Sequence, residues 1–223
     1  RVTPTALPKN DIKMENKKTP TRKVVTAHHD YDREYREGAH WDKEQQSGNI
    51  PLFMAHLRGG EKILDAGCGT GRDTMYLAQK GFHIVGIDQS EEGIRFARER
   101  AANKGIKEIA FDVGTIETLP YENQSFDAIY SGYVLGGETF PLQIKELGRV
   151  LKPGGVAYIA MFTETKYETP NERDEVNPKF FIHESLAPCF DIVEETEDSY
   201  SEEDDAGKHT HDRIRLILQR KRE

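Results

Sequence analysis

Short apolar segments alternate with amphipathic segments over the middle of the chain. The apolar segments predict strands near residues 62–66, 83–88, 107–112, 126–131 and 155–163. The amphipathic segments predict helices near 72–80, 90–103 and 141–151. In the second helix Ile94, Ala97 and Ala101 recur at the helical period. Ser90 directly before it is a good N-cap. Short crossovers of this kind build a parallel sheet with helices on both faces.

The last third of the chain departs from this alternation. Phe190–Thr196 and Asp212–Arg220 each predict a strand, and His183 is expected to start a helix after a long loop over 162–182. Only Glu197 to about Thr210 separates the two strands, which is too short for a crossover helix, so we expect them to pair antiparallel. A reversed last strand begins at the carboxyl edge of the parallel strands, where ligands bind. Segment 197–213 is therefore expected to overhang that edge.

A glycine-rich turn follows the first predicted strand. Gly67, Gly69 and Gly71 stand directly after the apolar run, and Asp88 ends the second strand 21 residues after Gly67. In nucleotide-binding βαβ units such glycines let the backbone approach the ligand, and an acid about 20 residues on accepts ribose hydroxyls. The turn therefore predicts a nucleotide-type ligand.

The residues around the glycines narrow that ligand. A pyrophosphate loop would need a third glycine at the position of Arg72, so a nicotinamide dehydrogenase is a weaker alternative. Asp65, two residues before Gly67, would repel a diphosphate but suits a ligand that carries an ammonium group. This pattern resembles the first motif of the class I S-adenosylmethionine-dependent methyltransferases.

Three further motifs extend the resemblance over about residues 62–163. In that family an acid after the third strand receives the adenine, and Asp112 stands there, followed by Val113. Residues 125–130 resemble the fourth strand, and 146–155 the helix and turn before the fifth strand in small-molecule methyltransferases. The resemblance implies S-adenosylmethionine as cofactor and an α/β fold. The implied fold is a Rossmann-like seven-stranded, mostly parallel sheet in the order 3-2-1-4-5-7-6, with strand 7 antiparallel and helices on both faces.

The resemblance also implies which residues bind the cofactor. They are Asp65, Gly67, Cys68, Gly69, Gly71, Asp88, Gln89, Asp112, Val113 and Ser131, with Trp41 as a further candidate. Trp41 belongs to a segment that interleaves aromatic and charged residues from Tyr31 to Asp42, like the leader helices that cap the cofactor in many of these enzymes. Trp41 is either a lid residue or a core contact, and both interpretations stay open. Residues 51–57 predict a helix that packs on the sheet.

A polar cluster begins the last predicted strand. His211, Arg213 and Arg215 point to one face of that strand, and Ile214, Leu216 and Leu218 to the other. Such histidines and arginines could deprotonate a nucleophile or hold an anion. Alternatively they balance the acidic run 191–205, which has nine acids and no base. The cluster resembles the tellurite-resistance group of methyltransferases, which implies His209 or His211, then Arg213, as catalytic residues. His183 is a further pocket candidate, and no zinc-ligand spacing is present.

Charge divides the chain into a basic leader and an acidic body. Residues 1–27 have a net charge of +5 and the remainder −13, which argues against a nucleic-acid substrate. We expect a flexible leader over 1–27, cap helices over 28–60 and a methyltransferase domain over 61–223. Within the leader, residues 1–13 precede Met14 and are either an extension or a native segment. With two cysteines and no apolar signal core or membrane span, we expect a cytoplasmic monomer or homodimer.

These features predict a methyltransferase that acts on a small-molecule acceptor, with a sulfur, selenium or tellurium nucleophile as one option. A quinone-biosynthesis C/O-methyltransferase is an alternative, although Gly136 and Gly137 stand where such relatives often carry His. A catalytically silent subunit that binds S-adenosylmethionine is a second alternative. The sequence does not name the acceptor.

Overall fold

The computed structural model describes residues 30–39, 41–42, 45–107, 109–167, 175–176, 179–204 and 207–222. The expected leader over 1–27 lies outside these residues, as do His28 and His29. Expectations about the leader and about the domain boundaries therefore stay predictions.

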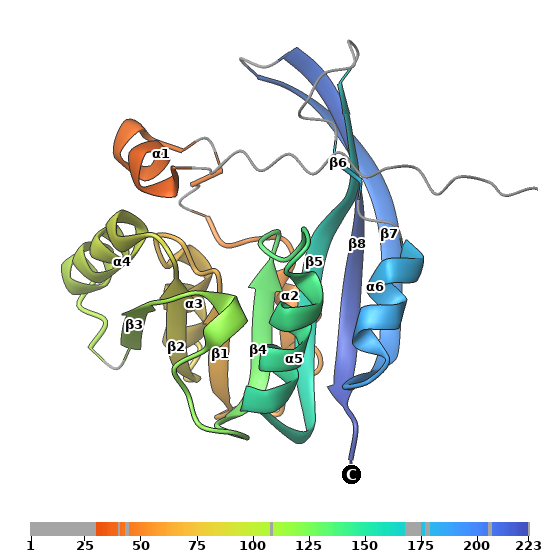
Figure 1. Ribbon diagram of the computed structural model, residues 1–223. Coiled ribbons are helices and arrows are strands. Elements are labelled where there is room, and N and C mark those ends of the chain that lie inside the picture. Colours follow the sequence, from red (N-terminus) through yellow and green to blue (C-terminus); the bar gives the residue numbers. More distant parts are fainter. Residues whose placement is uncertain are drawn as a thin grey trace, which may run out of the picture.

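The described strands form one sheet in the order β3-β2-β1-β4-β5-β8-β7, with the short β6 paired to β5 (Figure 1). Because β6 takes a number of its own, β7 and β8 are the sixth and seventh strands of the expected order, which is confirmed. The strands are β1 (Lys62–Ala66), β2 (His83–Asp88), β3 (Ile109–Val113), β4 (Phe126–Gly132), β5 (Leu151–Tyr167), β6 (Glu175–Val176), β7 (Phe190–Asp204) and β8 (Gly207–Arg220).

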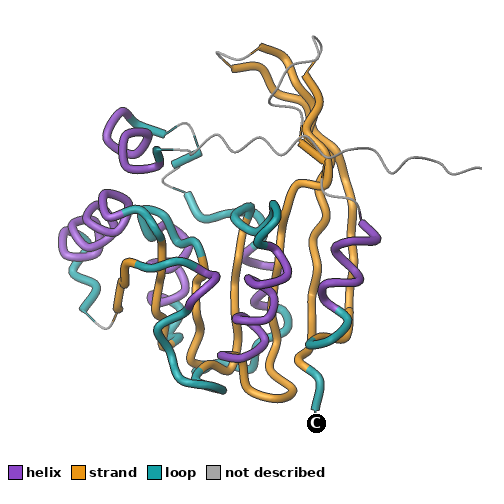
Figure 2. Tube along the Cα trace, viewed as in Figure 1, coloured by secondary structure: helices purple, strands orange, loops and turns teal. Residues whose placement is uncertain are grey.

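Strand β8 runs in the direction opposite to the first five strands of the sheet. The first five strands pair in parallel, whereas β8 runs antiparallel to both β5 and β7. Its first residues therefore lie at the carboxyl edge of the parallel strands. Figure 2 shows the ends of β5, β7 and β8 rising together beyond the neighbouring strands at this edge.

Helices cover both faces of the sheet, and each buries its own apolar core. The α5 face packs on α5 and α6 and includes Ile214, Leu216 and Leu218 of β8, all fully buried. The α2 face packs on α2 and α3, where Phe53 contacts the rings of Tyr130 and Tyr158. The helices are α1 (Tyr31–Glu37), α2 (Ile50–Met54), α3 (Arg72–Gln79), α4 (Glu91–Asn103), the short 3-10 helix η1 (Ile116–Thr118), α5 (Phe140–Val150) and α6 (Lys179–Leu186).

The N-terminal turn of α4 forms as its sequence predicts. The Ser90 hydroxyl accepts a hydrogen bond from the amide of Gly93, which satisfies one of the free donors at the start of the helix. Ile94, Ala97 and Ala101 are buried along one face. The N-terminus of α4 is therefore fixed directly after the end of β2.

The structure corrects the predicted limits of the last strands. β5 starts at Leu151, directly after α5, because Leu151 already pairs with Phe126. β5 also continues to Tyr167, so the long loop predicted from residue 162 is wrong, and α6 starts at Lys179 before His183. The segment between the last two predicted strands is not a loop, because β7 and β8 continue through it and pair as far as Asp204 and Gly207. Its polar pairs stabilise strands that apolar periodicity could not reveal, among them Ser199 with Asp212 (2.5 Å) and Ser201 with Thr210 (2.8 Å).

Candidate active site

The glycine turn after β1 is held by the acid at the end of β2. One oxygen of Asp88 accepts a hydrogen bond from the Gly69 amide (2.8 Å) and the other accepts one from the Ser90 amide (2.9 Å). Gly67, Gly69 and Gly71 have φ values of 83°, 54° and 77°, a region that favours glycine. Burial raises the pKa of the Asp88 carboxyl. Each oxygen keeps a lone pair for a further donor such as a ribose hydroxyl.

Asp65 lies beneath the glycine turn as a buried acid. It is 2% exposed, and its carboxylate accepts the Thr74 hydroxyl at 2.6 Å. Burial, reinforced by the nearby Asp73, raises the pKa of Asp65 to about 7. Asp73 itself is held by Arg72 and by the Ser47 amide (2.7 Å). A positive group delivered to Asp65 would offset the cost of its buried charge.

The predicted adenine end lies on the next strand. Asp112 and Val113 end β3 in register with Ile87 and Asp88 of β2, and the Gly114 amide donates to the Asp88 carbonyl at 2.9 Å. The Asp112 carboxylate accepts the Tyr121 hydroxyl at 2.8 Å. The Val113 side chain is 44% exposed, as an apolar surface for a flat ring would be.

The other predicted cofactor residues differ in how exposed they are. Gln89 is exposed beside Asp88, and burial raises the pKa of the Cys68 thiol, which keeps it protonated. Ser131 is fully buried, and its hydroxyl donates to the Ala66 carbonyl at 2.9 Å. The Ser131 side chain therefore ties β4 to β1, and a role in cofactor binding stays a prediction.

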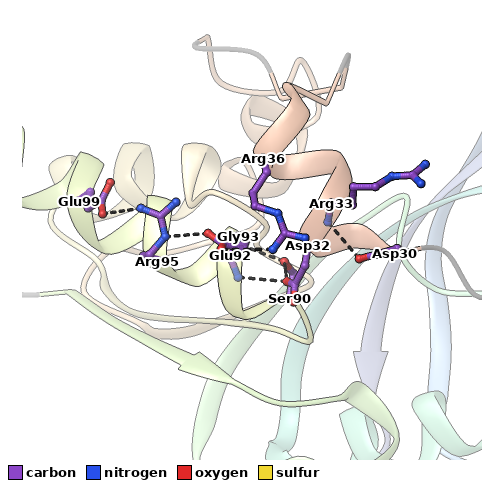
Figure 3. Close-up of polar contacts among 9 residues, drawn as sticks. All are labelled: Asp30, Asp32, Arg33, Arg36, Ser90, Glu92, Gly93, Arg95 and Glu99. Carbon is purple, nitrogen blue, oxygen red and sulfur yellow. Dashed lines mark hydrogen bonds and ion pairs between the residues drawn. The ribbon is translucent and has the colours of Figure 1, made fainter.

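Helix α1 lies across the start of α4 (Figure 3). One oxygen of Asp32 accepts the Ser90 hydroxyl (2.5 Å) and the Glu92 amide (3.1 Å). Arg36 adds an ion pair with Glu92 at 3.4 Å. None of the residues of α1 is buried, so these polar contacts to α4 hold the helix in place.

Aromatic residues of this N-terminal segment reach the glycine turn. A Cβ atom added to Gly69 would lie 2.5 Å from the Tyr35 hydroxyl, so Tyr35 sits directly over the turn. Trp41 packs edge-on against Tyr35 and is 39% exposed, which is more than a core residue shows. Asp42 binds Arg100 of α4 through both oxygens and also accepts the Thr70 hydroxyl (2.5 Å). The segment thus covers the turn, as the lid interpretation of Trp41 requires.

The loop after β4, residues 133–139, contacts both the glycine turn and the β7–β8 hairpin. A Cβ atom on Gly67 would collide with the Val134 side chain, so this loop lies over the turn. The preceding Tyr133 has a φ of 60° and stacks on Phe162 with ring centroids 4.8 Å apart. Phe162 in turn stacks on His211 at 4.5 Å. A row of rings therefore runs from Tyr133, the neighbour of Val134, to the predicted catalytic His211.

The two histidines of β8 are buried within this aromatic cluster. His211 is 8% exposed, and its Nδ1 lies 3.0 Å from the Thr165 hydroxyl. His209 is 3% exposed and contacts His211 edge-on, with its Nδ1 2.9 Å from the Gly207 carbonyl oxygen. The β7–β8 register places them opposite Tyr200 and Glu202 of the acidic run, so a catalytic role and charge balance both stay predictions for these histidines.

The arginines of β8 do contact that acidic run. Arg213 and Arg215 both bind Asp198 of β7, and Arg213 also donates to the Tyr133 hydroxyl at 3.2 Å. Arg213 holds the pKa of Asp198 below its usual range. His183 lies apart from this group and contacts Glu195 at 2.8 Å. The arginines thus neutralise an acid of β7, and Arg213 also contacts the loop after β4 through Tyr133.

Comparison with known proteins identifies the class. Residues 57–214 match the family model described as a methyltransferase domain, so the chain belongs to this family of S-adenosylmethionine-dependent methyltransferases. Phosphoethanolamine N-methyltransferase 1 of Arabidopsis thaliana is 37% identical over 118 residues, which is 52% of this chain and 24% of that protein. The malonyl-[acyl-carrier protein] O-methyltransferase of Erwinia pyrifoliae is 33% identical over 126 residues, 56% of this chain and 46% of that protein.

The chain thus spans less than half the length of these curated relatives. A SAM-dependent methyltransferase from Methanosarcina mazei shares the fold, with a TM-score of 0.63 and 24% identity over 80% of this chain and 100% of that one. These findings support the broad class and its cofactor, and the finer likeness to the tellurite-resistance group stays a prediction. Within the described ranges, no helix is long and apolar enough to cross a membrane.

The residues at the carboxyl edge fit S-adenosylmethionine. Asp65 offers a charge for an ammonium group, the positive-φ glycines carry no side chain that would keep a ligand away from the backbone, and Asp88 offers acceptor oxygens. Sequence reasoning did not single out Thr74, Tyr35, Tyr133 or Val134, which complete these contacts. Only the position of Tyr133, two residues past the end of a predicted strand, could have drawn attention to it, because post-strand residues line the ligand edge.

Replacing Gly69 should separate cofactor binding from backbone strain. Gly69→Ala places a Cβ against Tyr35, whereas Gly81→Ala, at a φ of 89°, meets no atom within 4 Å. Both variants should lose about 1 kcal/mol of stability from the left-handed backbone. Only Gly69→Ala should weaken S-adenosylmethionine binding, by about tenfold or more, measured by calorimetry on the folded variants. Equal affinity in the two variants would remove Gly69 from the cofactor site.

Replacing Asp65 should have opposite effects on stability and on binding. The folded-state pKa of about 7 lies above the unfolded value, so the folded protein gains a proton that the unfolded chain lacks between about pH 4 and 7. Wild-type stability from this group therefore falls as pH rises through that window. Asp65→Asn should be more stable than wild type above pH 7, by about 4 kcal/mol, and the difference should shrink toward pH 4.

The same Asp65→Asn variant should bind S-adenosylmethionine more weakly at pH 8, because it no longer offers a charge to the ammonium group. Denaturant unfolding at several pH values and calorimetry together measure both effects. A stability difference that does not vary with pH would contradict the buried, proton-binding state of Asp65. Unchanged cofactor affinity would place the ammonium group elsewhere.

Proposed function

We propose that this protein transfers the methyl group of S-adenosylmethionine to a small-molecule acceptor at the carboxyl edge of its sheet. The observation that carries the proposal is the double hydrogen bond of Asp88 to the Gly69 and Ser90 amides, within a chain of the methyltransferase family. The acidic body of the chain supports a small acceptor, because it repels nucleic-acid backbones.

Each part of the proposed site has a physical task. The cofactor, when bound, supplies an electrophilic methyl group on a sulfonium, and the protein must align a nucleophile with the bond that breaks. Asp88 and Asp112 accept hydrogen bonds at the ribose and adenine positions. Tyr35 and Trp41 exclude water from the glycine turn, which strengthens the electrostatic interactions beneath them.

The acceptor is proposed to lie between the post-β4 loop and the β7–β8 hairpin. The row of Tyr133, Phe162 and His211 supports this location, since Tyr133 directly precedes Val134, which lies against Gly67. A thiolate, selenide or telluride acceptor needs no strong base. An oxygen or nitrogen acceptor would give its proton to His211, or to His209 beside it.

Two other functions share the cofactor site. A quinone-type C/O-methyltransferase would use the same aromatic row for a flat acceptor, and a silent binding subunit would bind the cofactor without turnover. The row of stacked rings favours a chemical role over silence, because a subunit that only binds cofactor does not need an aromatic wall on the acceptor side.

A turnover assay tests the proposal. Purified protein with S-adenosylmethionine and a panel of small thiols, selenols, amines, phenols and carboxylic acids should release S-adenosylhomocysteine with at least one acceptor. With an oxygen or nitrogen acceptor, His211→Ala should lower kcat by about 100-fold or more while cofactor affinity stays within about twofold. His183→Ala, whose imidazole contacts Glu195 instead, is the matched control and should keep wild-type kcat.

Two results would contradict parts of this account. Tight cofactor binding without turnover on any acceptor class would favour the silent subunit. Equal kcat for His211→Ala and wild type on an amine or phenol would assign His211 to packing alone.

A further inference from the structure

Two buried polar groups on the α2 face have no hydrogen-bond partner within the described residues. They are the hydroxyl of Tyr158, a residue that is 1% exposed, and the Nε–H of Arg215. In folded proteins more than about nine buried polar groups in ten are satisfied, so each exception calls for an explanation. Burial raises the pKa of Tyr158, so its hydroxyl keeps the proton and can donate.

The register of the sheet brings these two groups together. Tyr158 of β5 pairs with Ile217 of β8, so Arg215 is its diagonal neighbour on the same face. Diagonal neighbours of an antiparallel pair are about 7–8 Å apart, within the reach of long side chains. Arg213 follows two residues further toward the carboxyl edge, opposite Phe162.

The charges around these groups do not cancel. Arg213 and Arg215 share one carboxylate, that of Asp198, so these three side chains have a net charge of +1. Arg213 also donates to the Tyr133 hydroxyl, and Tyr133 precedes the residue that lies over Gly67. The side chains of Arg213, Arg215 and Asp198 are 24%, 20% and 35% exposed, so a solute can reach their outer atoms, whereas the Tyr158 hydroxyl and the Arg215 Nε are themselves buried.

We propose that Tyr158, Arg215, Arg213 and Tyr133 form a subsite for an oxyanion, a carboxylate or phosphate group carried by the methyl acceptor. Unpartnered donors together with a surplus positive charge suit an anion, and they disfavour an ammonium group. A water molecule could satisfy the two donors but would leave the positive charge uncompensated. The role of the subsite rests on the proposed function, because the subsite would hold an acidic methyl acceptor beside the loop after β4. Anion binding itself does not depend on turnover.

Binding of inorganic phosphate and of acetate tests the subsite. Each anion is titrated at constant ionic strength against chloride, with the protein saturated with S-adenosylhomocysteine, and binding is followed by calorimetry and by phosphorus NMR for phosphate. Tyr158→Phe removes only the hydroxyl, and Arg215→Lys keeps the charge but removes the Nε–H donor. The control is Tyr130→Phe, whose ring stacks on Tyr158 but whose hydroxyl points to Asp73.

Wild type and Tyr130→Phe should bind at least one of the two anions saturably, while Tyr158→Phe and Arg215→Lys should bind it about tenfold more weakly or worse, since each loses a charge-assisted hydrogen bond. A preference for phosphate or for acetate then tells which oxyanion the acceptor carries. Absence of saturable binding in the wild type, or equal losses in all three variants, would overturn the subsite.

The acceptor panel supplies an independent comparison. Among acceptors with the same nucleophile, acidic members should show a KM at least tenfold below that of their neutral amides or alcohols, and Arg215→Lys should remove this preference. If anions bind as expected but no acceptor is methylated, the subsite stands and the proposed function fails. If neutral acceptors are preferred in the wild type, the proposed function stands and the subsite fails.

Discussion

The carboxylate of Asp88 is the interaction on which the rest of the site depends. It joins the glycine turn after β1 to the first turn of α4 by accepting one amide hydrogen from each. The Ser90 hydroxyl then bonds to Asp32, so the position of α1 also depends on this junction (Figure 3). The acceptor oxygens at the end of β2, the glycine turn and helix α1 are thus linked through one side chain.

The reversed strand β8 imposes the second constraint. Because it runs against β5, its polar first half rises at the carboxyl edge while its apolar second half fills the core (Figure 1). Alternation along the strand puts Ile214 and Leu216 under α6 and leaves Arg213 and Arg215 on the opposite face. One strand thereby contributes both to the core and to the proposed acceptor side.

Much of the fold could be predicted from the sequence, because apolar periodicity and the glycine turn specify local structure directly. The strand order, the reversed β8 and the N-cap at Ser90 are confirmed. The limits of β5, β7 and β8 were wrong, since their extensions toward the β7–β8 hairpin are largely polar and show no apolar period; cross-strand pairs, with His209 and His211 buried among them, stabilise these extensions instead. Such pairs depend on register, which a single sequence does not reveal.

The candidate site was predictable only in part. Glycines and acids in a spaced motif predict the cofactor positions, whereas Tyr35, Thr74 and Val134 are brought to this region only by tertiary packing. Nor did the sequence reveal that the Tyr158 hydroxyl has no hydrogen-bond partner among the described residues, because this depends on the packing around it. The sequence correctly placed Arg213 and Arg215 on one face of the strand. That both arginines bind Asp198 could not be predicted, because it depends on the β7–β8 register.

The most direct test of the account is the affinity of S-adenosylmethionine for Asp88→Ala, measured by titration calorimetry. Asp127→Ala is a suitable control, because this acid starts β4 at the opposite edge of the sheet, where it binds Lys152. Loss of a charged acceptor should weaken binding by about 2 kcal/mol or more, roughly 30-fold, in Asp88→Ala alone. Wild-type affinity in a folded Asp88→Ala variant would contradict the assignment of this junction as the cofactor site.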